Sequence, residues 1–302
     1  MKKSVKITLL VAAALVGLGL CLSMVGFALG GRFSSLLNMR LDPATGQWEQ
    51  VDEAGNVVND YTKGEYALPA GTDITALDID WVSGEVEILV TSGDAVSVME
   101  LVERGTSASY AMAVSEQDGV LKVRYVEDEL LTLPNLPAKK LVVHLPREMA
   151  ESLTEVSFSS VSADFDVDPL TVREKFAFSS VSGDLETDFI TAEGVDAEVS
   201  TVSGKISLDG SFRQVNGEST SGEIDLTLRT CPEKVSLVTV SGKADVELPR
   251  DAGFTLNYDT VSGDLECDFA AKRNGEKLIC GDGGCEISVS TTSGDLKIEV
   301  ID

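Results

Sequence analysis

The sequence predicts an all-β protein, a single β-solenoid with coils of about twenty residues, preceded by one transmembrane α-helix. Three observations support this fold class. A Ser-Gly pair recurs at nearly constant spacing, each pair opens an alternating apolar and polar run, and helix-period amphipathicity is missing outside one apolar stretch near the N-terminus. Short strands repeated at a fixed period are typical of chains that wind into stacked coils.

The repeat is a phrase of the form Val-Ser-Gly followed by a charged residue. Between Ser162 and Ser262 the repeat serines are 20, 21, 18, 20 and 21 residues apart. The variant Ser162-Ala163 opens this series. We expect the other copies to form structural turns, and they are Ser83-Gly84, Ser182-Gly183, Ser203-Gly204, Ser221-Gly222, Ser241-Gly242, Ser262-Gly263 and Ser293-Gly294.

Numbering each repeat Ser as position zero predicts which side chains face the core. Positions minus one, plus three and plus five are mostly apolar and share their parity with the Gly at plus one, so one strand would turn them all inward. Ser or Thr at minus two, the repeat Ser and the charged residue at plus two should face solvent. Apolar residues at minus four have the other parity, which places a corner between minus four and minus one.

The N-terminus predicts the location of the protein. Residues 7–29 are uncharged and, at about 1.5 Å per residue, would cross a bilayer core of roughly 30 Å. Lys2, Lys3 and Lys6 precede this stretch, so the N-terminus should be cytoplasmic and the solenoid extracellular, in a single-pass cell-membrane protein. Cleavage after Ala28 is the alternative.

Composition divides the chain into three parts. Residues 1–32 form the cytoplasmic stub and anchor, and residues 33–73, which include Pro43, Gly46, Gly55 and Gly64, form a polar juxtamembrane linker. Residues 74–302 form the solenoid, with irregular N-terminal coils and a cap over 74–150 and the Ser-Gly repeats over 151–302. The last alternating strand ends near Ile301 without an evident cap, which predicts an exposed edge through which copies could associate.

The charge of the chain excludes one class of partner and favours another. Its 50 acidic residues all follow the anchor, where 20 basic residues remain, so the ectodomain carries about −30. Such a surface repels nucleic acid and anionic lipid headgroups and attracts cations or basic peptides.

Position plus six is the candidate binding row. Like charges 4.8 Å apart repel by about 0.9 kcal/mol in water, so stacked carboxylates should collect loose Ca²⁺ or a basic partner. The alternative is a solvated face that keeps the protein soluble. No dedicated calcium-repeat motif is present. The row consists of Asp168, Asp188, Asp209, Glu247, Asp268 and Glu299, interrupted by Thr227.

The cysteines and the single histidine give little indication of metal binding or catalysis. Cys280 and Cys285 flank a Gly-rich segment, where an extracellular disulfide could close; free thiols are the alternative. One histidine, His144, is too few for His-pair metal ligation, and no nucleophile elbow surrounds any serine. We therefore predict no catalytic residue, no metal site and no cofactor. A β-helix enzyme acting on polysaccharide is a weaker alternative.

The Ser-Gly series, the strand Leu141–Pro146 and the anchor together resemble the bacterial "putative adhesin" β-strand-repeat family, a domain of unknown function. The resemblance covers residues 74–302 and departs from the simplest pattern at Ala163 and in the 31-residue spacing from Ser262 to Ser293. It implies a β-solenoid at the cell envelope, in a family often linked to envelope-stress systems, and it supplies no catalytic residues.

These observations together predict a non-catalytic, membrane-anchored envelope protein that displays an acidic solenoid. As an envelope-stress accessory it would bind cationic peptides or a membrane signalling partner. The alternative is a surface adhesion or glycan-binding module, in which a flank of the solenoid contacts glycan, a surface protein or a second copy.

Overall fold

The computed structural model describes residues 39–42, 47–50, 61–69, 71–103, 106–107, 110–126 and 136–301. Within these residues the regular secondary structure is almost entirely β-strand, as the repeat predicted, and no helix has the length and apolarity needed to cross a membrane. The predicted anchor over residues 7–29 lies outside the described residues, as does most of the predicted linker. Strands β1 (Met39–Asp42) and β2 (Gln47–Gln50) pair with each other as a separate antiparallel hairpin.

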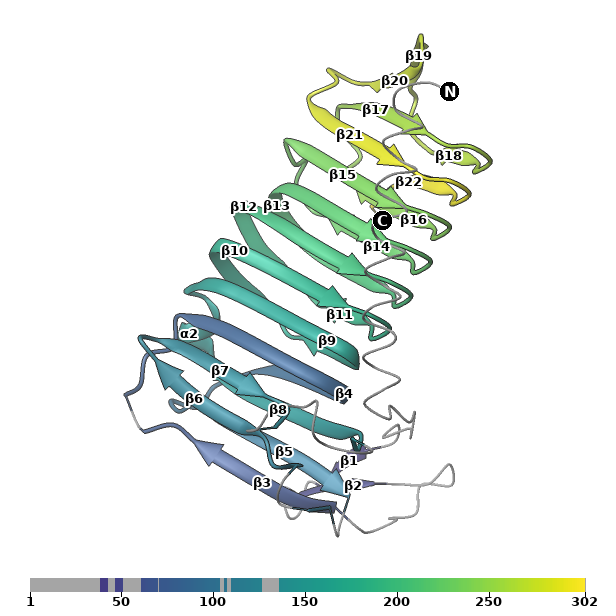
Figure 1. Cartoon of the computed structure of the whole chain (residues 1–302). Coiled ribbons are helices and arrows are strands. Elements are labelled where there is room, and N and C mark those ends of the chain that lie inside the picture. The colour runs from purple at the N-terminus through teal and green to yellow at the C-terminus, as the bar shows by residue number, and fades with distance from the viewer. Residues whose placement is uncertain are drawn as a thin grey trace.

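The solenoid begins with irregular strands and continues with the repeats (Figure 1). Its first part contains β3 (Tyr61–Ala67), β4 (Ala76–Thr91), β5 (Ser97–Glu103), β6 (Ala113–Gln117), β7 (Val120–Arg124), β8 (Lys139–Pro146) and the one-turn helix α2 (Arg147–Ala150). The repeats contain β9 (Leu153–Val167), β10 (Leu170–Ser180), β11 (Leu185–Thr187), β12 (Ile190–Thr201), β13 (Ile206–Ser219), β14 (Ile224–Leu228), β15 (Lys234–Thr239) and β16 (Ala244–Leu248). The C-terminal part contains β17 (Phe254–Asp259), β18 (Leu265–Cys267), β19 (Lys272–Asn274), β20 (Lys277–Cys280), β21 (Cys285–Ser290) and β22 (Leu296–Val300).

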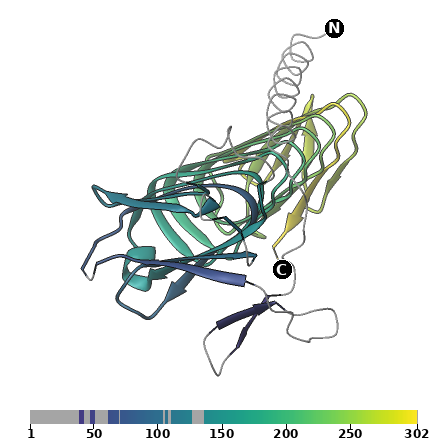
Figure 2. The same cartoon turned by 60° about the horizontal axis from the view of Figure 1, so that its bottom comes forward.

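Stacked coils form two mainly parallel sheets, which Figure 2 shows closer to the stacking axis. Sheet 1 contains the segments before each Ser-Gly corner, in the order β6, β7, β4, β9, β10, β12, β13, β15, β21, β17, β20, β19. Sheet 2 contains the segments after the corner, in the order β3, β5, β8, β4, β9, β11, β13, β14, β16, β22, β18. Strands β4, β9 and β13 are long enough to contribute to both sheets.

The core is made of columns of equivalent residues from successive coils. At position plus three, Phe165, Leu185 and Ile206 are in register and at most 2% exposed. Because like positions stack at about 4.8 Å, each apolar side chain lies between two of its own kind. Burial of the plus-three and plus-five columns confirms the predicted inward parity of the strands after the corner.

The predicted burial of the corner residues is partly wrong. Hydroxyl residues at minus two face inward: Thr201 is 4% and Ser219 0% exposed, whereas Val261 at minus one is 68% exposed. Each buried hydroxyl is hydrogen-bonded, as when Ser180 Oγ accepts the Gly183 N–H at 2.8 Å. A hydrogen-bonded Ser can replace an apolar residue in the core, so the corner falls between minus two and plus one, later than alternation alone indicates.

The Gly and Ser of each phrase join neighbouring coils. A Cβ on Gly222 would lie 2.0 Å from the carbonyl oxygen of Gly204, and one on Gly204 would lie 2.2 Å from that of Gly183. Beside this contact the repeat Ser donates twice to one carbonyl: the N–H and Oγ of Ser203 lie 2.9 and 3.3 Å from the Val181 oxygen. The inward position of the corner glycine is therefore confirmed, and its role is the close approach of backbones.

At both ends of the stack the coils do not follow chain order. At the C-terminal end β21 pairs with β15 and β17, and β22 pairs with β16 and β18, so the last coil in sequence lies inside the one before it (Figure 1). At the other end β4 lies between β9 and the later strands β7 and β8. The prediction that the last strand is an exposed edge is therefore wrong: β22 is paired on both sides, and the sheet edges at this end are β18 and β19.

The N-terminal coils contain a buried ion pair. Lys139 Nζ, which is fully buried, lies 2.5 Å from Glu100 Oε1 and 3.9 Å from the centre of the Tyr125 ring. Burial lowers the pKa of Lys139 to about 8 in spite of the Glu100 carboxylate, which favours the charged form. The Lys139 backbone also takes the place of a neighbouring corner, because a Cβ on Gly84, where φ is 109°, would lie 2.0 Å from its oxygen.

The corner contact predicts a strong effect of a single methyl group. We expect Gly222→Ala to lower the free energy of unfolding by at least about 2 kcal/mol, because the coils must separate to admit the Cβ. Gly194→Ala is the matched control, since a Cβ there meets nothing within 4 Å, and it should leave stability unchanged or slightly higher. Urea unfolding of the two variants measures this difference, and equal stabilities would contradict the proposed role of the corner.

Candidate functional site

The outer face of sheet 2 carries three parallel rows of charge. Positions plus two, plus four and plus six alternate with the buried columns, so all three rows share this face. Sequence analysis singled out the second and sixth positions and overlooked the fourth, although the same alternation applies to it. The overlooked row contains, in spatial order, Glu87, Asp166, Glu186, Ser207, Asp225, Asp245, Lys297 and Glu266.

Two neighbouring strands bring six carboxylates together without a basic residue among them. Along β9 and β11 and at the residues that flank them, the plus-two, plus-four and plus-six positions are all acidic, and Glu186 lies directly opposite Asp166 in the parallel register. Among the described residues none of the six carboxylates is in an ion pair. We call this group the acidic patch, and it consists of Asp164, Asp166, Asp168, Asp184, Glu186 and Asp188.

Backbone N–H groups compensate part of the negative charge of the acidic patch, which has no ion pairs among the described residues. Asp164 Oδ1 accepts the Asp184 N–H at 2.9 Å, Asp184 Oδ1 accepts the Lys205 N–H at 2.6 Å, and Asp168 Oδ2 accepts the Val90 N–H at 2.6 Å. These contacts fix the carboxylates to the sheet. Their remaining lone pairs point to solvent, where a positive ligand could reach them.

Two carboxylates of the acidic patch have raised pKa values. The pKa of Asp166 is raised, first by burial and then by the carboxylates of Glu87, Glu186, Asp188 and Asp168. The pKa of Asp164 is raised by burial and by the charges of Asp184 and Glu85, against the backbone hydrogen bond that lowers it. Crowded carboxylates with raised pKa values mark a place where added positive charge is favourable.

Elsewhere on this face the charges are largely neutralised. Lys205 Nζ lies 2.7 Å from Asp225, Lys243 Nζ lies 3.7 Å from Glu223, and Lys297 Nζ lies 2.6 Å from Glu299. On the other side of the acidic patch, Lys140 Nζ lies 3.1 Å from Glu85 and 2.6 Å from Glu87. Among the coils between the two ends of the stack, the uncompensated charge is therefore concentrated at β9 and β11; the end strand β18 also carries exposed carboxylates.

The predicted plus-six row is present but is not uniform. Asp168 and Asp188 belong to the acidic patch. Asp209 is ion-paired with Arg229, while Glu247 faces Glu299 across the β16–β22 pair. Asp268 lies at the end of the stack, after β18. Thr227 interrupts the row, as the sequence predicted, and Arg229 neutralises Asp209, which alternation within a single coil does not reveal.

A hollow adjoins the acidic patch where the small Ser207 interrupts the plus-four row. Its volume is about 260 Å³, and Glu186, Asp209, Asp225 and Glu247 are among the residues that line it. This hollow could receive one long basic side chain, with carboxylates on either side of it.

One group of carboxylates in the described residues is close enough to share a metal ion. Oxygens of Glu223, Asp225 and Asp245 lie within 4.8 Å of one another. Lys205 and Lys243 are ion-paired with the same carboxylates, so two of their three negative charges are already compensated. No residue of the predicted plus-six row belongs to this group, and loose Ca²⁺ binding by that row stays a prediction.

Of the two alternatives for Cys280 and Cys285, a disulfide or free thiols, the structure has the free thiols. Both residues are register partners of Phe254, Cys280 from β20 on one side of β17 and Cys285 from β21 on the other. Two strand spacings separate their backbones by roughly 10 Å, whereas a disulfide needs Cα atoms within about 7 Å. Both are buried free thiols, and burial raises the pKa of Cys285 to about 12.

The fold places the chain among β-solenoid proteins, and its sequence identifies the family. Residues 74–215 and residues 153–299 each match the family described as Toastrack DUF4097. The two matches overlap and are offset by roughly four coils, as expected for a repeat. Together they cover well over half of the chain, which therefore belongs to the Toastrack family, a family of domains of unknown function.

Solved structures with a similar fold come from several bacteria. A "putative cell adhesion protein" from Clostridium sporogenes is 12% identical with a TM-score of 0.39, covering 80% of this chain and 100% of that one. A "putative adhesin" from Bacteroides fragilis is 12% identical with a TM-score of 0.44, covering 80% and 98%. A "putative lipid binding protein" from Parabacteroides distasonis is 15% identical with a TM-score of 0.43, covering 78% and 96%. A search of the curated proteins found no match.

The raised pKa of Asp166 predicts a pH-dependent stability. A raised folded-state pKa means that the charged form destabilises the fold, and this cost is absent below the unfolded pKa, near 3.8, and present once pH exceeds the folded pKa. Asp166→Asn should therefore raise the free energy of unfolding near pH 7 and have little effect below about pH 4. Urea unfolding at the two pH values measures this.

Asp118→Asn is the matched control for this prediction. Asp118 lies in the exposed turn between β6 and β7 with φ of 54°, a conformation that Asn also tolerates. An Asp166→Asn variant that is less stable than the parent near pH 7 would show that the acidic patch is not repulsive.

Proposed function

We propose that the protein is a non-catalytic component of the bacterial cell envelope, anchored through residues 7–29 with the solenoid outside, that binds cationic peptides at the acidic patch. In this role it would act as an accessory of an envelope-stress response. The observation that carries the proposal is the concentration of uncompensated carboxylates on β9 and β11, within an ectodomain of about −30.

The spacing of the acidic patch suits an extended basic peptide. Asp164 and Asp166 are alternate residues of β9 and Asp168 follows its last residue, so carboxylates along the strand repeat at about 6.8 Å. A peptide in extended conformation that carries Lys or Arg at alternate positions presents positive charges at the same interval. Laid along β9 and β11, it would match each charge with two carboxylates, and the neighbouring hollow would accept one further basic side chain.

A basic juxtamembrane segment of a signalling protein would offer the same chemistry. A solenoid held at the membrane surface by its own anchor would lie at the height of such segments. Capture of a cationic peptide could then compete with the signalling partner for one site, which would link the peptide to the stress response.

Binding of a cationic antimicrobial peptide to the full-length chain in detergent tests the proposal. We expect binding at low ionic strength that weakens steeply at physiological salt, because exposed charges are screened beyond about 8 Å. The triple variant Asp166→Asn, Glu186→Gln, Asp188→Asn should weaken binding by about tenfold or more. Fluorescence anisotropy of a labelled peptide gives the dissociation constants.

The matched control removes three carboxylates from the outer face of sheet 1 by Glu155→Gln, Glu198→Gln and Glu218→Gln, which are exposed. Both triple variants have the same net charge. Equal loss of binding in the two would show that overall charge, and not the acidic patch, attracts the peptide, and no binding at low salt would rule out the peptide role.

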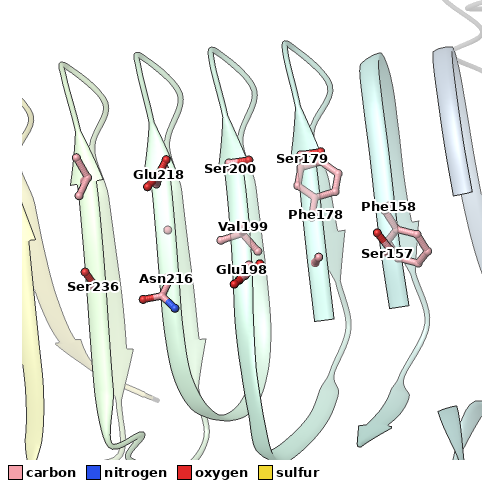
Figure 3. Close-up of a pocket in the computed structure, with 13 residues that line it drawn as sticks. Ser157, Phe158, Phe178, Ser179, Glu198, Val199, Ser200, Asn216, Glu218 and Ser236 are labelled. Atoms are coloured by element: carbon pink, nitrogen blue, oxygen red, sulfur yellow. The ribbon is translucent and has the colours of Figure 1, made fainter. Parts of the chain in front are cut away.

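A second candidate, surface adhesion through glycan binding, is favoured by a shallow trough on the outer face of sheet 1 (Figure 3). The trough has a volume of about 510 Å³ and crosses β9, β10, β12, β13 and β15. Ser179 and Ser200 line it as register partners at about 4.8 Å. Ser157 and Ser236 lie at the two ends of the adjacent row, which also contains Glu198 and Asn216. Such a surface can hydrogen-bond the hydroxyl groups of a sugar chain.

This candidate predicts retention of the protein on bacterial wall glycan that salt barely changes, because neutral hydrogen bonds are not screened. Ser200→Trp would fill the trough and should abolish retention, while Asp166→Asn should not. Pull-down with purified wall glycan measures this, and salt-sensitive retention, or retention by the Ser200→Trp variant, would exclude the trough.

A further inference from the structure

The C-terminal end of the stack presents two unpaired strands. In the part of the chain that the structure describes, β18 pairs only with β22, and β19 pairs only with β20. Each therefore has a row of backbone N–H and C=O groups without strand partners along its outer side. Unprotected strands of this kind readily pair with another chain.

Apolar residues that are buried in other coils are partly exposed at this end. Leu265 and Cys267 are in register with Leu296 and Ile298, which are at most 1% exposed, yet both are themselves half-buried. Phe269 packs on the core at 5.3 Å from the Phe254 ring and is also only partly covered. At the corner of the same coil Val261 is 68% exposed, more than any other large hydrophobic residue in the described part of the chain.

Opposite charges flank this apolar centre. The β18 side carries Asp264, Glu266 and Asp268, all exposed, which we call the acidic edge. The β19–β20 hairpin carries Lys272, Arg273 and Lys277, also exposed, which we call the basic edge, and a single acidic residue, Glu276. Three neighbouring basic residues are unusual in a chain with a net charge of −26. The end surface therefore has two sides of opposite sign.

The two sheets also end at different heights. Sheet 1 continues beyond β17 by two strands, β20 and β19, whereas sheet 2 stops at β18 (Figure 1). A two-fold axis parallel to the strands would turn a second copy so that its sheet 1, which extends further, meets sheet 2 of the first copy. The same rotation places the acidic edge of each copy against the basic edge of the other, and apolar centre against apolar centre.

We propose that two copies of this chain associate end to end through this surface, with β18 of each copy beside β19 of its partner. Such an isologous contact uses one surface twice and closes as a dimer without growing into a fibre. Complementary charges bring together two ectodomains whose net charge would otherwise keep them apart. The proposal does not depend on peptide binding, because the acidic patch lies on other coils, at β9 and β11.

A charge-reversal experiment on the full-length chain in detergent tests the dimer. One variant reverses the acidic edge by Asp264→Lys and Asp268→Lys, and the other reverses the basic edge by Lys272→Glu and Arg273→Glu. Each alone should weaken self-association in sedimentation equilibrium by about tenfold or more, because like charges then meet across the two-fold axis. An equimolar mixture should recover association to within about threefold of the parent, since each variant complements the other.

The control variant carries Glu174→Lys and Glu193→Lys, two exposed reversals on the middle coils, and should associate like the parent. Thermal unfolding of each variant checks that the fold is kept. A parent chain that stays monomeric, a dimer indifferent to both edge reversals, or a mixture that fails to recover would each overturn the proposal. Loss of peptide binding with an intact dimer would overturn only the proposed function.

Discussion

Contact between backbones at the Ser-Gly corner is the constraint on which the rest of the structure depends. The carbonyl oxygen of one corner glycine occupies the space that a side chain on the next would need, as between Gly204 and Gly222. This contact holds the corners at strand spacing, and the hydroxyls on either side complete it. Thr201 Oγ1 accepts the Gly204 N–H at 2.9 Å within a coil, and Ser203 Oγ donates to the Val181 carbonyl oxygen of the neighbouring coil. The inward hydroxyls at position minus two, such as Thr201 and Ser219, thereby find partners.

Once the corners are in register, the outer faces become rows of like residues. A residue type repeated at one position of the coil is multiplied along the stack, so a modest preference for acids becomes a charged face. Basic residues at a few of these positions, such as Lys205 and Lys243, then decide where the charge stays uncompensated. The acidic patch results from two successive coils that lack such a residue.

Much of the fold can be predicted from the sequence, because the alternation within each repeat indicates which positions face the core. The plus-three and plus-five columns, the inward glycine and the solvated plus-two row are visible in any single coil. The inward hydroxyl of Ser219 is not, since its burial depends on a hydrogen bond to the Gly222 carbonyl oxygen. Coil order at the ends is also hidden, because Leu296 shows the same alternation whichever coil lies beside it. The positions of Cys280 and Cys285 depend on that order, and so could not be predicted from their spacing.

For the candidate site, the sequence shows the acidic residues but not which of them lack a basic neighbour in the fold. Arg229 comes two residues after Thr227 in the chain, and only the stacking places its guanidinium against Asp209 of the preceding coil. The plus-four row was accessible from alternation alone. Which of its members lack a basic neighbour depends on contacts between coils, which have no signature within one coil.

The inverted coil order at both ends limits how such a protein can change in length. The last coil, β21 and β22, separates the body of the stack from β17 and β18, so its removal would leave the end coil without the strands on which it rests. A coil added after β22 would find no free edge there. Coils can be gained or lost only in the middle of the stack, where each contacts its neighbours in chain order, and the two interlocked ends would be inherited as fixed units.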